Sequence, residues 1–350
     1  MKVLICDYPE PMNRDLRVED RFLRAGLGEE LSVTHWVYNG RENDLLGHLR
    51  GADALLTAYL ELPARVLDRA GKLRFISIEA TGYNLVDADA AARNGIGVAV
   101  IGEYCTEEVA DHTLALALAV SRRLKTYARS TERDRRFDFA AAEPMFRFSG
   151  AVWGVLGYGR IGRAVARRAR GFGMRVIAWD RRFPPAEAAR QGVELLPRDE
   201  VLAQSRILSL HTLLVPETVH LLDDAAFAKM ENRPVVVNVS RGGLIDEAAL
   251  LRALDSRRVF GAGLDVLDCE SHAAMQTNPL VGREDVVLTP HAAFYSAEAM
   301  EACARISCRN IAAYFTGRRQ EVFRMVNRPQ EPAAGTARAV SSQTKGSASA

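Results

Sequence analysis

The stretch GVLGYGRIGRAVARRARGFGMRVIAWD, residues 154–180, places three glycines between an apolar run and a basic, helix-like run. The spacing of Gly157, Gly159 and Gly162 between two expected strands is typical of a dinucleotide-binding turn. Gly157 permits the tight turn, Gly159 lets the backbone approach a pyrophosphate at a helix N-terminus, and Gly162 lets helix and strand pack closely. The competing interpretation is a glycine turn that binds nothing.

Asp180 ends the same stretch, 18 residues after Gly162. A carboxylate at this point accepts hydrogen bonds from the ribose hydroxyls of an adenosine and repels a 2′-phosphate. The expected cofactor is therefore NAD (NADH), with NADP less favoured. Arg181 and Arg182 follow directly, and their charges weaken this preference.

Valine-rich runs without polar alternation recur through residues 151–290, as in AVWGVLG, PVVVNVS and DVVLTPH. Such runs indicate strands buried on both faces of a parallel sheet. Shorter runs in residues 2–100, such as KVLICDY, DALLTA and GVAV, alternate with helix-like segments in the same way. We therefore predict an α/β protein with two doubly wound parallel-sheet domains, a Rossmann NAD-binding domain and a flavodoxin-like substrate domain.

The domain boundaries follow from this alternation of apolar runs and helix-like segments. Residues 104–293 are the predicted Rossmann domain, and residues 1–103 with 294–328 are the predicted substrate-binding domain, which is discontinuous. One long helix over 105–130 is expected to connect them. Residues 331–350 contain no large apolar residue except Val340, so 329–350 is predicted to be a disordered tail.

Composition restricts the class of partner. Lys and Arg number 46 against 44 Asp and Glu, which gives no general electrostatic reason to bind nucleic acid or a membrane. The five cysteines form no CxxC pair, and no apolar run suits a signal peptide or a membrane span. A cytoplasmic protein with a small-molecule partner is expected. The histidines show neither the HxxxH nor the HExxH spacing that is typical of a metal site, so no metal site is expected.

Three polar residues follow three later strands: Arg241 after VVVNVS, Glu270 shortly after GAGLDV, and His291 after VVLTP. Ligands of open α/β sheets bind beyond the carboxyl ends of the strands, so these side chains are expected to face one crevice. His291 would donate and accept a proton, Glu270 would orient it, and Arg241 would bind a substrate carboxylate. Taken singly, each residue is more simply a surface or loop residue.

Over residues 1–325 the chain resembles the D-isomer-specific 2-hydroxyacid dehydrogenases. The segments that carry the resemblance are ATGYNLVDADAAARNGI (80–96), EEVADHTLALAL (107–118), GVLGYGRIG (154–162), LHTLLVPETVHLLD (210–223), VNVSRGGLIDEAAL (237–250), GAGLDV (261–266) and LTPHAAFYS (288–296). The resemblance implies NAD-dependent interconversion of a 2-keto acid and a D-2-hydroxy acid. It also implies a homodimer formed through the segment around 105–150.

The resemblance assigns further residues of this chain. The catalytic arginine, glutamate and histidine fall on Arg241, Glu270 and His291. The substrate-binding residues would be Ala80, Thr81 and Gly82, together with Arg241. The remaining cofactor-binding residues would be Arg160, Ile161, His211, Thr218, Val239 and Asp265.

Two departures from the family leave alternatives open. The chain reads DCESHAAMQTNPL where many relatives have a proline-rich loop, and HAAFYS where many have PHIGG, which is closer to D-lactate dehydrogenases and C-terminal-binding-protein corepressors. Phe294 would then line the substrate pocket, or else pack at the hinge. A scaffold that senses NAD(H) is one alternative function. A formate or phosphite dehydrogenase is another, although formate enzymes carry glutamine at the position of Glu270.

The run RSTERDRRFDF, residues 129–139, is the last open question. Mixed charges of this kind usually form a solvated face. The alternative is that one of its arginines reaches a neighbouring subunit's cleft and favours a phosphorylated or phosphonylated keto acid.

Overall fold

The structure, a computed structural model, describes residues 1–329. Its described residues form two compact units: a first unit of residues 1–104 together with 300–329, and a second unit of Cys105–Ala299. The second break thus falls after Ala299, whereas the sequence suggested residue 293. Apart from Pro329, the predicted tail lies outside the described residues.

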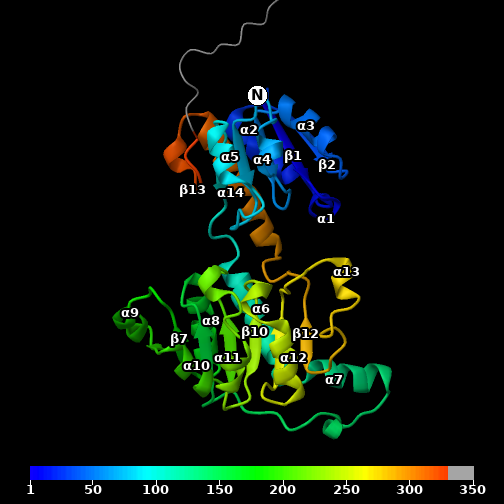
Figure 1. The fold of residues 1–350 in the computed structure, drawn as a ribbon, viewed down its shortest axis with the longest axis vertical. Coiled ribbons are helices and arrows are strands. Elements are labelled where there is room, and N and C mark those ends of the chain that lie inside the picture. Colours follow the sequence, from blue (N-terminus) through cyan, green and yellow to red (C-terminus); the bar gives the residue numbers. More distant parts are fainter. Residues whose placement is uncertain (330–350) are drawn as a thin grey trace, which may run out of the picture. The chain divides into compact units, whose positions relative to one another are not determined.

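The first unit is built on a six-stranded sheet in the order β13-β5-β4-β3-β1-β2 (Figure 1). Its strands are β1 (Lys2–Asp7), β2 (Ser32–Val37), β3 (Ala54–Thr57), β4 (Phe75–Ile78), β5 (Gly97–Val100) and β13 (Arg324–Met325). The first five are parallel in the order 2-1-3-4-5, and only β13 is antiparallel. This is the flavodoxin-like order that was expected.

Helices and one short 3-10 turn complete the first unit: α1 (Pro9–Met12), α2 (Arg17–Leu27), α3 (Glu42–Gly51), α4 (Ala64–Leu67), α5 (Ala88–Arg93), α14 (Ala297–Phe315) and η5 (Arg319–Glu321). Strands β3, β4 and β5 are buried throughout, as their apolar runs predicted. The edge strand β2 was missed because all its residues are at least partly exposed and its sequence SVTHWV contains no apolar run.

The second unit contains a seven-stranded parallel sheet in the order β12-β11-β10-β9-β6-β7-β8. Its strands are β6 (Val152–Leu156), β7 (Arg175–Trp179), β8 (Glu194–Leu195), β9 (Ile207–Leu210), β10 (Val235–Asn238), β11 (Gly261–Leu264) and β12 (Val286–Leu288). This is the Rossmann order with one added strand, and the strand order reverses between β6 and β9. The predicted α/β class is therefore confirmed.

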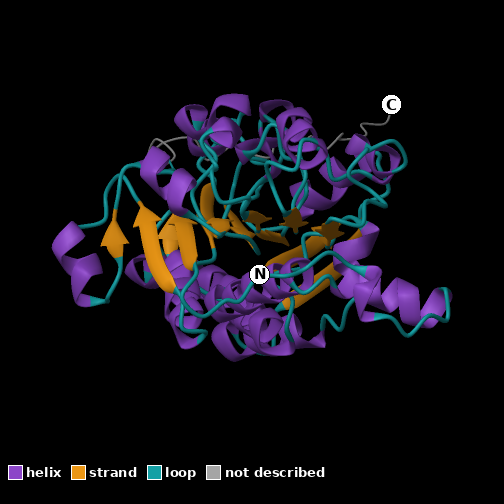
Figure 2. Ribbon diagram, turned by 90° about the horizontal axis from the view of Figure 1, so that it is seen from below, coloured by secondary structure: helices purple, strands orange, loops and turns teal. Residues whose placement is uncertain are grey.

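Helices cover both faces of this sheet (Figure 2). They are α6 (Thr106–Ser121), α7 (Leu124–Ala128), α8 (Arg160–Gly171), α9 (Pro185–Arg190), α10 (Arg198–Gln204), α11 (Asp224–Ala228), α12 (Glu247–Asp255) and α13 (His272–Met275), with short turns η1 (Arg129–Arg133), η2 (Phe139–Ala141), η3 (Pro216–Thr218) and η4 (Gly242–Leu244). In β10, Val235 and Val237 enter one apolar core and Val236 enters the other. Burial on both faces explains why these strands show no polar alternation.

The single helix predicted over residues 105–130 is wrong. Helix α6 ends at Ser121 and α7 begins at Leu124, because Arg123 has a left-handed backbone with φ of 53°. The Arg123 guanidinium is buried 4.0 Å from the centre of the Phe260 ring, donates to the Phe260 carbonyl and pairs with Glu143. Tertiary contacts of one arginine thus override the helical periodicity of the sequence.

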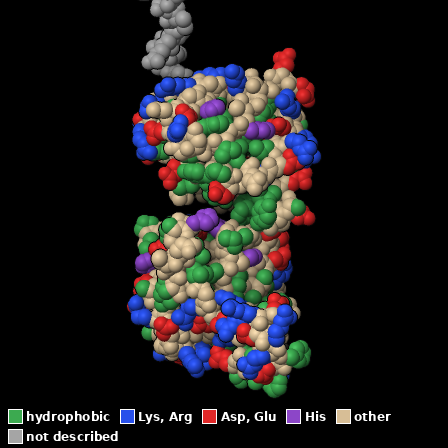
Figure 3. Space-filling model, turned by 90° about the vertical axis from the view of Figure 1, so that its right-hand side faces the viewer, with side chains coloured by type: hydrophobic (Ala, Val, Ile, Leu, Met, Phe, Trp, Pro, Cys, Tyr) green, Lys and Arg blue, Asp and Glu red, His purple; other side chains and the backbone are tan. Residues whose placement is uncertain are grey.

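The surface carries charges of both signs. Lys and Arg side chains are interspersed with Asp and Glu on the face shown in Figure 3. Within residues 1–329, every helix is too short or too polar to cross a bilayer. None of the five cysteines forms a disulfide.

Candidate active site

The three glycines lie at the point where the strand order of the second unit reverses. Gly157 follows β6 with φ of 98°, and a Cβ there would lie 2.6 Å from the backbone of His211. A Cβ on Gly162 would lie 2.1 Å from the Gly157 carbonyl oxygen. A Cβ on Gly159 would meet nothing within 4 Å. Two glycines are therefore required by packing, and the third leaves open space where α8 begins.

Asp180 lies immediately after β7 and is fixed by backbone amides. Its Oδ2 accepts from the Tyr158 N–H at 2.8 Å, and its Oδ1 accepts from Arg182 and Phe183 at 2.8 and 2.9 Å. The carboxylate is thus held beside the glycine turn. Oδ2, which accepts only one of these hydrogen bonds, has a further lone pair that can accept from a ligand hydroxyl.

The other predicted cofactor-binding residues differ in exposure. Arg160 is the exposed first residue of α8, while Ile161 is half-buried against the core. The buried Thr218 hydroxyl contacts the Leu213 carbonyl at 2.6 Å and accepts from the Val215 N–H, so it shapes the loop after β9. Val239 is buried directly after β10.

His211 directly follows β9 and is half-buried. Its Nε2 lies 2.9 Å from the Ser209 hydroxyl, and its Nδ1 is enclosed with no partner among the described residues. Burial lowers the pKa of His211 to about 3. The ring is therefore neutral near neutral pH and is not a proton donor there.

Arg241, Glu270 and His291 follow the neighbouring strands β10, β11 and β12. Parallel pairing of these strands brings their carboxyl ends to one edge of the sheet. The His291 Nδ1 lies 2.9 Å from Glu270 Oε2, and the two side chains are 38% and 41% exposed. The pair is therefore joined by a hydrogen bond and open to a substrate.

Electrostatics tie Arg241 to this pair. Burial raises the pKa of the Glu270 carboxyl, but the hydrogen bond and charge of His291, and to a smaller extent the charge of Arg241, bring it below its usual value. Glu270 is therefore ionised near neutral pH. An ionised carboxylate can only accept hydrogen bonds, so it accepts from a protonated Nδ1 of His291, and Nε2 takes no part in this hydrogen bond.

Sequence reasoning missed the residues that support this trio. Buried Asn238 accepts from the Ser240 N–H at 3.0 Å and donates to the Arg241 carbonyl at 2.9 Å, which fixes the turn that carries Arg241. The family resemblance implied that Asp265 lies near the cofactor, but its contact with the loop of His291 was not predicted. The backbone N–H groups of Ala292 and Ala293 each donate to its carboxylate at 2.9 Å.

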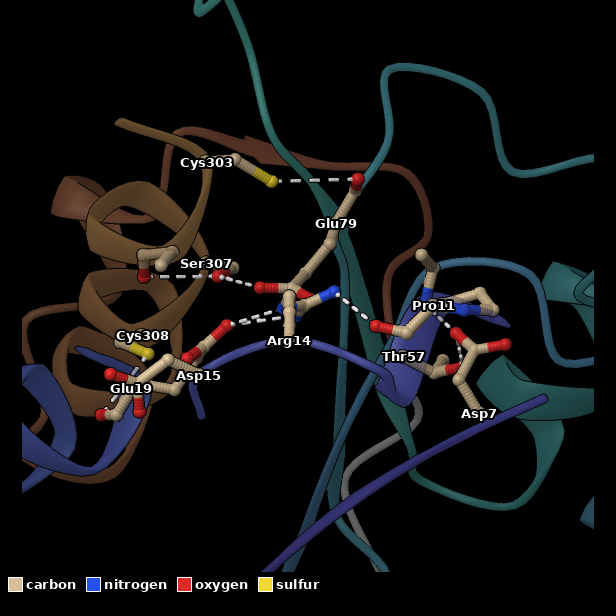
Figure 4. Close-up of polar contacts among 12 residues, drawn as sticks. Asp7, Pro11, Arg14, Asp15, Glu19, Thr57, Glu79, Cys303, Ser307 and Cys308 are labelled. Carbon is tan, nitrogen blue, oxygen red and sulfur yellow. Dashed lines mark hydrogen bonds and ion pairs between the residues drawn. The ribbon is translucent and has the colours of Figure 1, made fainter. Parts of the chain in front are cut away.

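In the first unit, the predicted substrate-binding residues Ala80, Thr81 and Gly82 form the loop after β4. Glu79, directly before this loop, is buried and accepts from the Ser307 hydroxyl at 3.1 Å and from the Arg14 guanidinium (Figure 4). Ser307 lies on α14.

The Glu79 carboxylate shares its cation with a second acid. Arg14 also donates to Glu19 at 2.8 Å, and Glu19 Oε2 is buried without a partner among the described residues. Burial raises the pKa of Glu79, and the charge of Arg14 offsets this only in part. The Arg14 guanidinium thus lies between the buried carboxyl groups of Glu79 and Glu19 and fixes the residue that precedes the loop. No local sequence motif predicts this cluster.

Phe294 is half-buried and packs against the apolar core of the second unit, with its ring centroid 6.1 Å from that of Tyr295. Packing is thus one role of this side chain, and its place in a substrate pocket stays a prediction. Among residues 1–329, no group of three His, Cys, Asp or Glu side chains is arranged to hold a metal ion.

Residues 114–293 match the family described as D-isomer specific 2-hydroxyacid dehydrogenase, NAD binding domain. The chain belongs to this family. It is 38% identical to the D-3-phosphoglycerate dehydrogenase of Mycobacterium bovis over 79% of its own length and 52% of that protein. It is 34% identical to the glyoxylate reductase of Pyrococcus furiosus over 83% of its own length and 88% of that enzyme. The chain therefore spans about half the length of the mycobacterial relatives and most of the archaeal one.

Two solved structures extend this likeness. The D-lactate dehydrogenase of Aquifex aeolicus, complexed with NAD and lactic acid, has a TM-score of 0.78 at 25% identity, covering 94% of this chain and 100% of that one. An acyclic imino acid reductase in complex with NADPH and D-Arg has a TM-score of 0.78 at 27% identity, covering 93% and 100%. The family's cofactor is a nicotinamide dinucleotide, and both phosphorylation states occur among similar proteins.

The residues present fit such a dinucleotide. The N-terminus of α8 offers backbone N–H groups to a pyrophosphate, and the space beside Gly159 is free of side chains. Asp180 is held by three backbone amides at the end of the adjacent strand. The second unit is therefore an NAD(P)-binding domain.

The glycine geometry predicts opposite effects for two matched substitutions. Gly157→Ala forces a Cβ into the His211 backbone at positive φ, so the free energy of unfolding should fall by about 2 kcal/mol or more. Gly159→Ala should leave it unchanged or raise it by about 0.5 kcal/mol, while weakening NADH binding. Urea unfolding and NADH titration measure both. Equal destabilisation by the two variants would contradict this account.

The depressed pKa of His211 predicts acid sensitivity. Because the unfolded chain binds this proton below about pH 6.5 and the folded chain only near pH 3, stability should fall as pH drops through that window. At pH 5 this one group accounts for about 2 kcal/mol. The free energy of unfolding can be measured for the parent chain and for His211→Gln by urea unfolding at pH 7.5 and pH 5, followed by intrinsic fluorescence. Between these two pH values, the variant should lose about 2 kcal/mol less than the parent chain. An identical loss in both proteins would refute the assignment.

Proposed function

We propose that the protein is an NAD(H)-dependent dehydrogenase that interconverts a 2-keto acid and the D-2-hydroxy acid. The observation that carries the proposal is the hydrogen bond of 2.9 Å between His291 Nδ1 and Glu270 Oε2, at the sheet edge that also carries Arg241. The names of similar proteins, among them a glyoxylate reductase and a D-lactate dehydrogenase, support the same substrate class.

Each of the three side chains has one task in this reaction. Arg241 binds the substrate carboxylate through its planar guanidinium and polarises the adjacent carbonyl. NADH, when bound, supplies the hydride. His291 gives the Nε2 proton to the carbonyl oxygen during reduction and takes it back during oxidation. Glu270 stays ionised, keeps the imidazole in this orientation and stabilises its positive charge.

The loop of Ala80, Thr81 and Gly82 is the proposed second contact for the substrate carboxylate. Its support is the buried anchor of Glu79, which fixes the first residue before the loop through Arg14 and Ser307. A loop fixed in this way keeps its backbone amides in one orientation, which favours a small anionic substrate.

NAD is proposed as the preferred dinucleotide because the Asp180 carboxylate repels a 2′-phosphate at that position. Its supports are the three backbone amides that lock the carboxylate beside the glycine turn. Comparing NADH with NADPH in one assay checks this choice.

An unphosphorylated keto acid is favoured over a phosphorylated one. In the run 129–139, Arg129 pairs with Glu284 and Asp134, and Arg136 pairs with Asp138. Two of the four arginines of the run are thus paired with carboxylates of the same unit, which supports a salt-bridged surface rather than a phosphate-binding one.

A homodimer is proposed through the segment around 105–150. The rings of Phe137 and Phe139 are almost fully exposed, and Leu124 is more than half exposed. Exposed large apolar side chains gathered in one segment are typical of a protein interface. A second copy of the chain is the occupant that the family resemblance implies.

Catalysis is tested by NADH oxidation with pyruvate, hydroxypyruvate, glyoxylate, phenylpyruvate and a phosphonate analogue. At least one keto acid should be reduced, and His291→Ala should lower kcat by about 10²- to 10⁴-fold while NADH still binds. His272→Ala, a change of an exposed histidine at the start of α13, serves as the control and should keep kcat.

Two results would overturn this function. Unaltered turnover in His291→Ala would remove His291 from the acid–base role. Tight NADH binding without turnover of any keto acid would favour the NAD(H)-sensing scaffold instead.

The dimer is tested by changing its exposed rings. The double variant Phe137→Asp with Phe139→Asp should sediment as a monomer, because four carboxylates would face each other across the twofold interface. Val281→Asp, at a partly exposed apolar residue outside the segment, should leave the parent mass unchanged. A parent chain that is monomeric at micromolar concentration would end the proposal.

A further inference from the structure

His112 lies on α6 and is none of the catalytic, cofactor-binding or substrate-binding residues that the sequence predicted. Its Nε2 is 2.9 Å from the Thr289 hydroxyl and 3.5 Å from Asp265 Oδ1. Thr289 and Asp265 are 177 and 153 residues further along the chain, and both border the loop that carries His291. The contact therefore joins a covering helix to the proposed acid–base centre.

The hydrogen bonds among His112, Thr289 and Asp265 fix the direction in which the Thr289 hydroxyl donates its proton. The Thr289 hydroxyl donates to Asp265 Oδ1 at 2.5 Å, and the backbone N–H groups of Ala292 and Ala293 also donate to this carboxyl group. The single proton of the hydroxyl is therefore committed to Asp265. The Thr289 oxygen must then accept from His112, so His112 carries a proton on Nε2.

Asp265 links Thr289 to His291 through its hydrogen bonds to the loop that carries His291. Its carboxylate, which is 1% exposed, gathers Thr289, Ala292 and Ala293, and its backbone carbonyl accepts from the His291 N–H at 2.7 Å. His291 itself has φ of 52°, a left-handed conformation that a non-glycine residue keeps only when its surroundings impose it. The bonds to Asp265 supply that restraint.

We propose that His112 is a positioning residue for catalysis. The relay from His112 Nε2–H to the Thr289 hydroxyl and on to the Asp265 carboxylate holds the 289–293 loop in the conformation that presents His291 to the substrate. The inference rests on the proposed function, because it assigns His291 the proton transfer. His112 does not touch the reacting atoms.

The test replaces the donor and then restores it. His112→Leu removes the donor and should lower kcat about 10- to 100-fold, because a misplaced catalytic group reacts slowly. The KM for the keto acid and the dissociation constant of NADH should change little, because the relay ends on the loop of His291 and not on Arg241. His112→Gln, whose amide N–H can reach the same hydroxyl, should restore most of kcat. Asp111→Asn on the same helix, where the acid pairs with Arg168, is the control.

A double-mutant cycle separates a relay from general damage to the fold. Thr289→Val should lower kcat as His112→Leu does, and the two changes together should cost no more than either alone. If the fold-losses of kcat in the two single variants multiply in the double variant, the two residues act independently and the relay is wrong. A loss of kcat in His112→Gln equal to that in His112→Leu would also overturn it.

A spectroscopic measurement tests the relay without turnover. In ¹⁵N-histidine-labelled protein, the ring signal that disappears in His112→Gln should be that of an Nε2-protonated imidazole, and Thr289→Val should shift it. A His112 ring protonated only on Nδ1, or one insensitive to Thr289→Val, would disprove the relay. If no keto acid is turned over while this signal behaves as expected, the proposed function fails and the relay stands as a structural contact.

Discussion

Parallel pairing of β10, β11 and β12 is the constraint on which the proposed site depends. Because the three strands run in one direction and in register, the residues that follow them reach a common edge. Arg241, Glu270 and His291 are distant in sequence, but each follows one of three adjacent strands by three to six residues. The parallel sheet thus brings the three side chains to one edge, and the left-handed backbone of His291 is the local adjustment that its loop needs.

Hydrogen-bonded carboxylates organise the strand ends of both units. In the second unit, Asp180 and Asp265 accept mostly from backbone amides and thereby fix the loops beside them. In the first unit, Asp7 plays the same part for the backbone of Ala58 and Tyr59 after β3. Acids at these positions thus shape the backbone as well as provide charge, which agrees with the rule that buried charges are hydrogen-bonded.

The sequence predicted what depends on local spacing. The glycine turn, Asp180 and the strand-end trio are each read within a few residues of a valine-rich run, and the structure has them at the expected ends of strands. Contacts between remote segments could not be read in this way. The break at Arg123 depends on Phe260, and the order of the His291 loop depends on His112. The edge strand β2 was missed because its exposure removes the apolar signal.

Because the first unit is built from two separate segments of the chain, it cannot complete its fold until the second unit has been synthesised. Its sheet gains β13 and its central helix α14 only after all of Cys105–Ala299 has been translated. The Ser77 hydroxyl donates to the Ser307 carbonyl across this gap of 230 residues. On the ribosome, the second unit can therefore close its core while the first still exposes one face of its sheet. The first unit therefore begins to emerge before the second but completes its core after it.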